Sequence, residues 1–199
     1  MKKLMIFLMI VATCGLFTSC GDDDWGNNNP EMEHIYYYGL GNVKFPGGNE
    51  LKYNVNQGET IAIPTYFWSA YTRSYSPVVA YYTSSDKLVL GTDYQVVDKD
   101  GKVSLSDVTV VLKMALNIEK VLSPDNNGGY SMTWPNAKQG SQDVYIKALN
   151  GATGSLKVLT FDPTKKMDQT DVSSTIIVKT NEYEVRAFTE NYYVTVNIK

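Results

Sequence analysis

Histidine and cysteine are scarce in this chain of 199 residues, which contains one histidine and two cysteines. Because His34 is the one histidine and stands next to the expected tether, the sequence excludes a histidine-activated nucleophile and a multi-histidine zinc site within one chain. We interpret His34 as a solvated surface residue. The motifs of nucleophile elbows, P-loops and dinucleotide-binding turns are also missing, which disfavours nucleotide-dependent enzymes.

The sequence near the N-terminus lacks an apolar run long enough to cross a membrane. The uncharged run from Leu4 to Ser19 spans 16 residues, whereas a transmembrane helix needs about 20. Lys2 and Lys3 precede this run, and small residues end it just before Cys20. These are the three parts of a secretory signal peptide, which we place at residues 1–19.

One of the two cysteines remains after the signal is removed. Cys14 lies inside the signal, so the mature chain keeps only Cys20. A single cysteine has no partner within the molecule. The segment resembles the bacterial lipoprotein signal, with Ser19 just before the cysteine and apolar Phe17 three positions before it. The resemblance implies a diacylglycerol on Cys20, and two or three acyl chains anchor a protein stably to a membrane. The alternative is an ordinary signal cut elsewhere that leaves a free thiol.

An acidic tract, 21–24, follows this cysteine and resembles the tract after the lipidated cysteine in surface lipoproteins of the Bacteroidetes. The resemblance implies an outer-membrane protein that faces the cell exterior. The alternative is that three aspartates keep a linker solvated. Residues 20–34, rich in Asp and Asn, are expected to form a flexible tether.

Basic residues are in deficit. Losing Lys2 and Lys3 with the signal leaves 16 Lys and Arg against 21 Asp and Glu, so the formal net charge changes from -3 to -5. Binding to nucleic acid requires a basic face, so we do not expect nucleic acid as a partner. Residues 35–199 are numerous enough for a single domain with a sizeable core.

Alternating apolar and polar residues dominate that domain, which is typical of half-buried strands. Many short strands separated by turns, with at most one helix, predict an all-β fold, an Ig-like antiparallel β-sandwich. Pro64 cannot donate a ladder hydrogen bond, so its strand is expected at an edge or at a bulge. The expected strands are 35–40, 51–55, 60–68, 77–83, 156–161, 174–179, 183–188 and 192–198.

The order of short motifs resembles the Calx-β-like Ig sandwiches of secreted and surface proteins over about residues 50–180. The matching motifs are Tyr82-Thr83, 91–94, 132–134, Gly140 and 144–147. Similar short lipoproteins occur beside glycan-uptake systems in Bacteroidetes. Gln57 replaces the Glu that calcium-binding members carry before Gly58.

An insertion at 103–130 interrupts this pattern. Ser106-Asp107 would cap a helix whose apolar residues share one face, whereas the β-branched run 108–111 favours a strand. We expect a strand first and a helical turn after it.

Four aspartates are the candidates for carboxylate chemistry: Asp93, Asp98, Asp100 and Asp143. A glycosidase needs two facing carboxylates, but turns use Asp for backbone reasons alone. We therefore expect no enzyme and no catalytic residue.

Calcium is the one cofactor that the sequence suggests. The turn 98–101 begins like an EF-hand loop, but Lys102 and Thr109 stand where oxygen ligands are needed. Asp93, Asp98 and Asp100 are the candidates for a shallow Ca²⁺ site, and a plain turn is the preferred interpretation.

Aromatic residues are abundant, with 15 Tyr and three Trp. Sugars present apolar faces and hydroxyl rims, which suit exposed aromatic rings. If Phe67 points inward, strand alternation turns Tyr66 and Trp68 outward. Tyr66, Trp68, Tyr71 and Tyr81 are the candidate glycan-binding residues, and the alternative is that these rings only pack on strands.

Two functions therefore stay open. The first is a non-catalytic lipoprotein that binds polysaccharide, and it predicts exposed rings with polar groups beside them. The second is a structural or adhesive protein that contacts another surface protein through a sheet face or edge. It predicts a large exposed apolar patch or a long unpaired edge.

Overall fold

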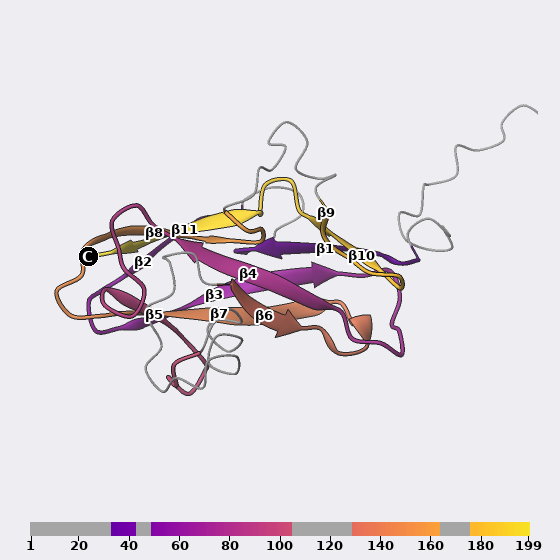
Figure 1. The fold of residues 1–199 in the computed structure, drawn as a ribbon, viewed down its shortest axis with the longest axis horizontal. Helices are drawn as coiled ribbons and strands as arrows, with labels where there is room; N and C mark the ends of the chain where they lie inside the picture. The colour runs from indigo at the N-terminus through magenta and orange to yellow at the C-terminus, as the bar shows by residue number, and fades with distance from the viewer. Residues whose placement is uncertain (1–32, 43–48, 105–128, 164–175) are drawn as a thin grey trace, which may run out of the picture.

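The computed structural model describes residues 33–42, 49–104, 129–163 and 176–199 (Figure 1). Their strands form two sheets, one with six strands and one with five. The six-stranded sheet has the order β5 (Tyr94–Val97), β7 (Gly140–Ala148), β3 (Thr60–Trp68), β1 (Ile35–Leu40), β10 (Glu184–Ala187) and β9 (Ile176–Lys179). The five-stranded sheet has the order β2 (Lys52–Val55), β11 (Tyr193–Ile198), β8 (Gly154–Leu159), β4 (Val78–Ser84) and β6 (Gly129–Thr133). A 3₁₀ turn, η2 (Pro135–Ala137), links β6 to β7.

The two sheets pack face to face as a sandwich, which confirms the predicted all-β sandwich. Both sheets are mixed rather than purely antiparallel, because β1 pairs parallel to β10 and β11 pairs parallel to β2. A parallel pair needs a long connection between its strands, and here most of the chain separates β1 from β10. The first strand of the domain therefore lies inside a sheet rather than at its edge.

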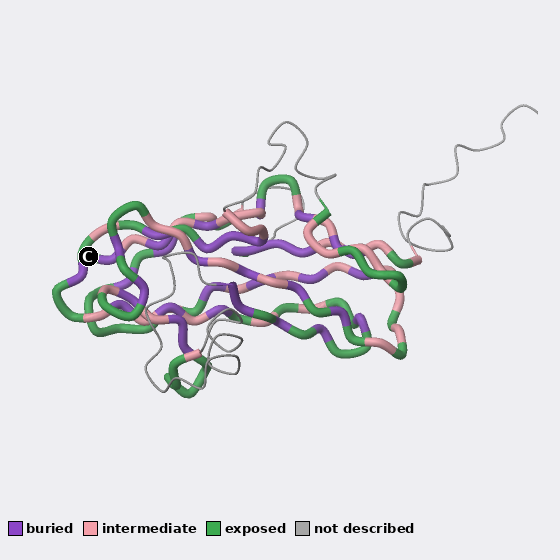
Figure 2. Tube along the Cα trace, viewed as in Figure 1, coloured by how far each residue is buried: buried purple, intermediate pink, exposed green. Residues whose placement is uncertain are grey.

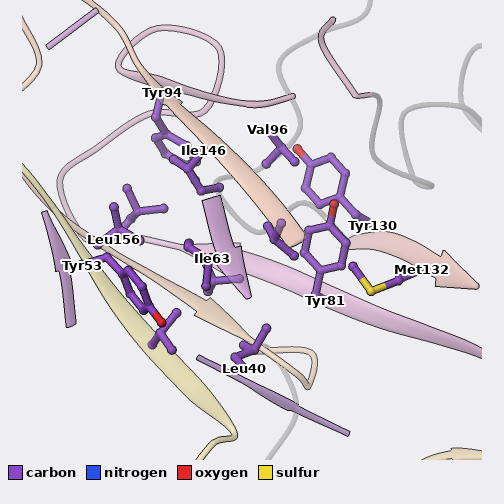
Figure 3. Close-up of a cluster of buried hydrophobic side chains, with 14 of the residues drawn as sticks. Leu40, Tyr53, Ile63, Tyr81, Tyr94, Val96, Tyr130, Met132, Ile146 and Leu156 are labelled. Carbon is purple, nitrogen blue, oxygen red and sulfur yellow. The ribbon is translucent and has the colours of Figure 1, made fainter. Parts of the chain in front are cut away.

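One core fills the space between the sheets, and buried residues alternate with more exposed ones along strands such as β3, β4 and β11 (Figure 2). Tyr94 of the six-stranded sheet donates to Thr83 Oγ1 of the five-stranded sheet across the core (3.1 Å). At one end of the core the Phe67 and Trp134 rings stack with centroids 4.9 Å apart. Figure 3 shows the middle of the core, where side chains from both sheets meet.

The expectation that Pro64 marks an edge strand or a bulge is wrong, because β3 is interior and its register with β7 runs without a shift. β3 lies between β7 and β1, and Pro64 pairs with Asp143 of β7. The ladder between β3 and β1 ends at Thr65 and Leu40. The Pro64 carbonyl then accepts from the Gly41 N–H (2.7 Å). The nitrogen of Pro64, which has no hydrogen to donate, thus points to the side where the ladder with β1 has ended. No strand hydrogen bond is lost there, so a proline is tolerated in this interior strand.

Several expectations lie outside the described residues. These are the signal peptide 1–19, Cys20, the tether up to residue 32 and most of the insertion, 105–128. In the described part of the chain, no helix is both long and apolar enough to span a membrane.

Candidate functional site

Strand alternation sorts the aromatic residues of β1 and β3 onto two sides of the six-stranded sheet. Phe67 is fully buried, and Tyr66 and Trp68 on either side of it are half-buried on the outer face. The predicted inward direction of Phe67 and outward direction of its neighbours is confirmed. On β1, Tyr36 and Tyr38 are likewise buried, and Tyr37 between them is outward.

Four rings meet on this outer surface. Tyr37 is paired with Trp68 across the strands, and their rings meet edge to face with centroids 5.9 Å apart. Phe188, just beyond β10, lies 5.7 Å from the Tyr37 ring and 6.0 Å from the Tyr66 ring, centroid to centroid. We call Tyr37, Tyr66, Trp68 and Phe188 the aromatic face.

Gly39 allows Phe188 to take its place in that face. Gly39 is inside β1 and pairs with Tyr66. A Cβ atom at Gly39 would lie 2.8 Å from Cδ2 of Phe188, closer than two carbon atoms pack. Because Gly39 has no side chain, the Phe188 ring can pack over it and lie between Tyr37 and Tyr66.

Polar side chains border the aromatic face on both sides. Gln139 Nε2 donates to the Tyr66 hydroxyl (2.6 Å). On the other side, Arg186 Nε donates to Glu184 Oε1 (2.7 Å), and Lys179 Nζ donates to Glu184 Oε2 (3.3 Å). The hydrogen bond to Glu184 raises the pKa of Arg186, and Tyr37 acts in the same direction. The guanidinium is thus held between a carboxylate and the first ring of the face.

Tyr81 does not belong to the face, although the sequence suggested it. Its side chain is 8% exposed, and its ring stacks on Tyr130 in the core with centroids 5.3 Å apart (Figure 3). Both faces of β4 carry a tyrosine, Tyr81 and Tyr82, so alternation alone could not decide which one is buried. Tyr71 lies in the loop after β3, with the Arg73 guanidinium 5.0 Å from its ring centroid.

The aspartates suggested for calcium hold turns. Asp98 Oδ1 accepts from the backbone N–H groups of Asp100 and Lys102 (2.9 and 2.8 Å). Asp93 Oδ2 accepts from the Val89 N–H (2.7 Å). Within the described ranges, no three His, Cys, Asp or Glu side chains gather closely enough to hold a metal ion. The turn interpretation of 98–101 is confirmed by its Gly101 N–H to Asp98 carbonyl hydrogen bond (3.0 Å).

The chain has distant structural likenesses and no matching family. No protein-family model and no curated protein matches this sequence. It is similar to a cohesin domain from a crystal structure of the CaDoc0917–CaCohA2 complex, with 14% identity, 82% of this chain and 99% of that chain covered, and a TM-score of 0.40. It is also similar to AvmM, which catalyses macrocyclization in alchivemycin A biosynthesis, with 13% identity, 82% and 90% covered, and a TM-score of 0.35. Neither likeness carries an argument about function.

Sequence reasoning found two members of the aromatic face and missed two. Tyr37 stands in a run of three tyrosines, and only the burial of Tyr36 and Tyr38 shows which one faces outward. Phe188 reaches the face because β10 lies beside β1, and no local pattern signals that pairing. Gln139 is placed by the turn between η2 and β7, which sequence reasoning did not anticipate.

Proposed function

We propose that this chain is a non-catalytic surface lipoprotein that binds glycan through its aromatic face. The observation that carries the proposal is the cluster of four outward rings with hydrogen-bonding side chains at its margins. Rings cover the apolar faces of sugars, and polar groups at the margin bond their hydroxyls. A rigid sheet holds these groups in place before a ligand arrives, which lowers the entropy cost of binding.

The location is part of the same proposal. A lipid on Cys20 would hold the domain at the outer membrane, facing the exterior, with the tether 20–34 between them. Its sandwich would then be of the Ig-like, Calx-β-like kind found beside glycan-uptake systems, an assignment that rests on motif order. Membrane and polysaccharide are the proposed partners.

The edge strands give little support to the adhesive alternative. Within the described residues, the outermost strands β5, β9 and β2 have four residues each and β6 has five. Short edge strands offer little backbone to a partner strand. Adhesion through the aromatic face itself remains an outcome that the binding experiment distinguishes.

The test is affinity electrophoresis of the full-length protein in gels that contain neutral polysaccharides, with Trp68→Ala as the variant. We expect retardation of the wild type and about tenfold weaker binding of the variant, since an aromatic anchor contributes more than 1 kcal/mol. The matched control is Tyr193→Ala, which removes a half-buried ring from the outer side of the five-stranded sheet. The control should bind like the wild type.

Two results would contradict the proposal. If Trp68→Ala binds as well as the wild type, the aromatic face is not the glycan site. If the wild type is retarded by no polysaccharide but Trp68→Ala abolishes its association with another surface protein, the adhesive function replaces the glycan function.

A further inference from the structure

A second surface feature lies at the end of the sandwich where β1 begins. It is an open hollow of about 480 Å³, bounded by the start of β1, the turn between β9 and β10, and the loop before β4. Volumes of about 300–1,000 Å³ are usual for small-molecule sites. The hollow is at the opposite end of the sandwich from the C-terminus (Figure 1).

Two stacked tyrosines form a firm wall of this hollow. The Tyr75 and Tyr183 rings stack with centroids 5.5 Å apart and planes 15° from parallel. The Tyr75 hydroxyl lies 2.6 Å from the Tyr36 hydroxyl and 3.0 Å from His34 Nδ1. The Tyr183 hydroxyl accepts from the Val78 N–H (3.2 Å). These contacts hold both phenols of the lining in place.

A polar turn that ends at Tyr183 forms another part of the lining. Thr180 Oγ1 accepts from the N–H groups of Glu182 and Tyr183 (3.1 and 3.0 Å), which holds the turn closed. Asn181 stands at the tip of this turn and lines the hollow. An amide both donates and accepts hydrogen bonds, as a sugar hydroxyl requires.

Charge around the hollow is balanced. Lys179 carries the positive charge of the lining, and Glu182 and Glu184 carry the negative charges. Arg186 binds Glu184 as well (2.7 Å), so the four groups sum to a formal charge of zero. An uncharged polar ligand fits this balance better than an anion or a cation, because neither sign has a surplus to attract it.

The hollow adjoins the aromatic face along β1. Ile35 lines the hollow, and Tyr37 of the face is two residues further on the same side of the strand, which is about 7 Å. Glu184 pairs with Ile35 in the sheet and borders both features. A chain of sugars lying on the aromatic face could therefore extend along β1 toward the hollow.

We propose that this hollow is a subsite for the terminal residue of a neutral glycan whose preceding residues lie on the aromatic face. The inference rests on the proposed glycan-binding function and adds a ligand class and a direction to it. The bound chain runs from the aromatic face toward the end of the sandwich where the tether enters.

The test compares a long neutral polysaccharide with oligosaccharides prepared from it by partial acid hydrolysis, both bound to the full-length protein. Asn181→Trp fills the hollow, and Asn150→Trp is the matched control in an exposed turn at the opposite end of the sandwich. Oligosaccharides have many ends for their length, so we expect Asn181→Trp to weaken their binding at least about fivefold. Its binding of the polysaccharide and all binding by Asn150→Trp should change less than about twofold.

A second variant, Tyr75→Phe, keeps the stacked ring and removes the hydroxyl between His34 and Tyr36, so it tests the hollow if Asn181→Trp does not fold. Oligosaccharide binding by both variants at the wild-type level, with binding still lost in Trp68→Ala, overturns the subsite and leaves the aromatic face as the glycan site. A wild type that binds acidic oligosaccharides and no neutral ones overturns the ligand class. A wild type that binds no glycan overturns both proposals.

Discussion

At the scale of single residues, two buried tyrosines on the same side of β1 differ in whether their hydroxyl groups have a hydrogen-bond partner. Tyr36 shares a 2.6 Å hydrogen bond with Tyr75. Tyr38 is fully buried, and within the described residues its hydroxyl makes no hydrogen bond. Burial is the main cause that raises the pKa of both phenols. Thr65, which partly offsets this effect at Tyr38, donates its own proton to the Gln142 carbonyl (2.9 Å).

These surroundings predict opposite effects of the same substitution. Tyr36→Phe loses a hydrogen bond and should lower the free energy of unfolding by about 1 kcal/mol. Tyr38→Phe removes a buried hydroxyl without a partner, so the free energy of unfolding should stay the same or rise by up to about 1 kcal/mol. Urea unfolding followed by tryptophan fluorescence measures both. Equal losses in the two variants would contradict the assignment.

At the scale of elements, the β9–β10 hairpin carries an ion cluster beside the aromatic face. Burial by itself would raise the pKa of Glu184, but hydrogen bonds from Arg186 and Lys179 outweigh it and lower the pKa below its ordinary 4.5. A carboxyl whose pKa is lower in the folded state stabilises the fold above its unfolded value. That stabilisation is lost as the pH falls through the folded value.

Glu184→Gln should therefore be less stable than the wild type at pH 7, by about 1 kcal/mol or less, and the difference should shrink below pH 4.5. Thermal melts between pH 3 and pH 7 measure it. Glu182→Gln, in the exposed turn of the same hairpin, is the control and should follow the wild type. A Glu184→Gln difference that is constant with pH would show that the cluster does not shift this carboxyl.

At the scale of the whole molecule, the described residues begin at Glu33, just before β1, which is an interior strand, so the proposed tether would join the sandwich there. Glu33 lies at that entry, where its carboxylate is 3.2 Å from Arg73 Nη2 and its carbonyl accepts from the same nitrogen (2.9 Å). The proposed anchor would thus hold the domain by the end that carries the hollow. The aromatic face extends away from that end along β1 and β3.

Cys20→Ser should move the protein from the membrane fraction to the soluble fraction, because each acyl chain contributes about 0.8 kcal/mol per buried methylene and serine accepts none. Cell fractionation with mass spectrometry of the N-terminal peptide measures this. Cys14→Ser, inside the predicted signal, is the control and should leave the protein on the membrane. Recovery of wild-type protein with an unmodified Cys20 thiol would refute the anchor.

Local pattern was sufficient to place several strands and, in β3 and β11, to predict which side of the strand is buried. Alternation of apolar and polar residues predicts β3 and its buried residues Ile63, Thr65 and Phe67. It predicts the apolar side of β11 in the same way. It also predicts that Tyr66 and Trp68 point outward. Alternation fixes such directions because successive side chains of any strand lie on opposite faces, whatever its neighbours are.

Only the tertiary structure decided which strands became neighbours. The parallel pairing of β1 with β10 joins segments about 150 residues apart and brings Phe188 over Gly39. The position of β3 between β7 and β1 places Pro64 inside a sheet. The hollow is lined by Tyr75 and Tyr183, which come from loops about 100 residues apart and stack on each other. Contacts between distant strands depend on how the whole core packs, and no local period encodes that choice.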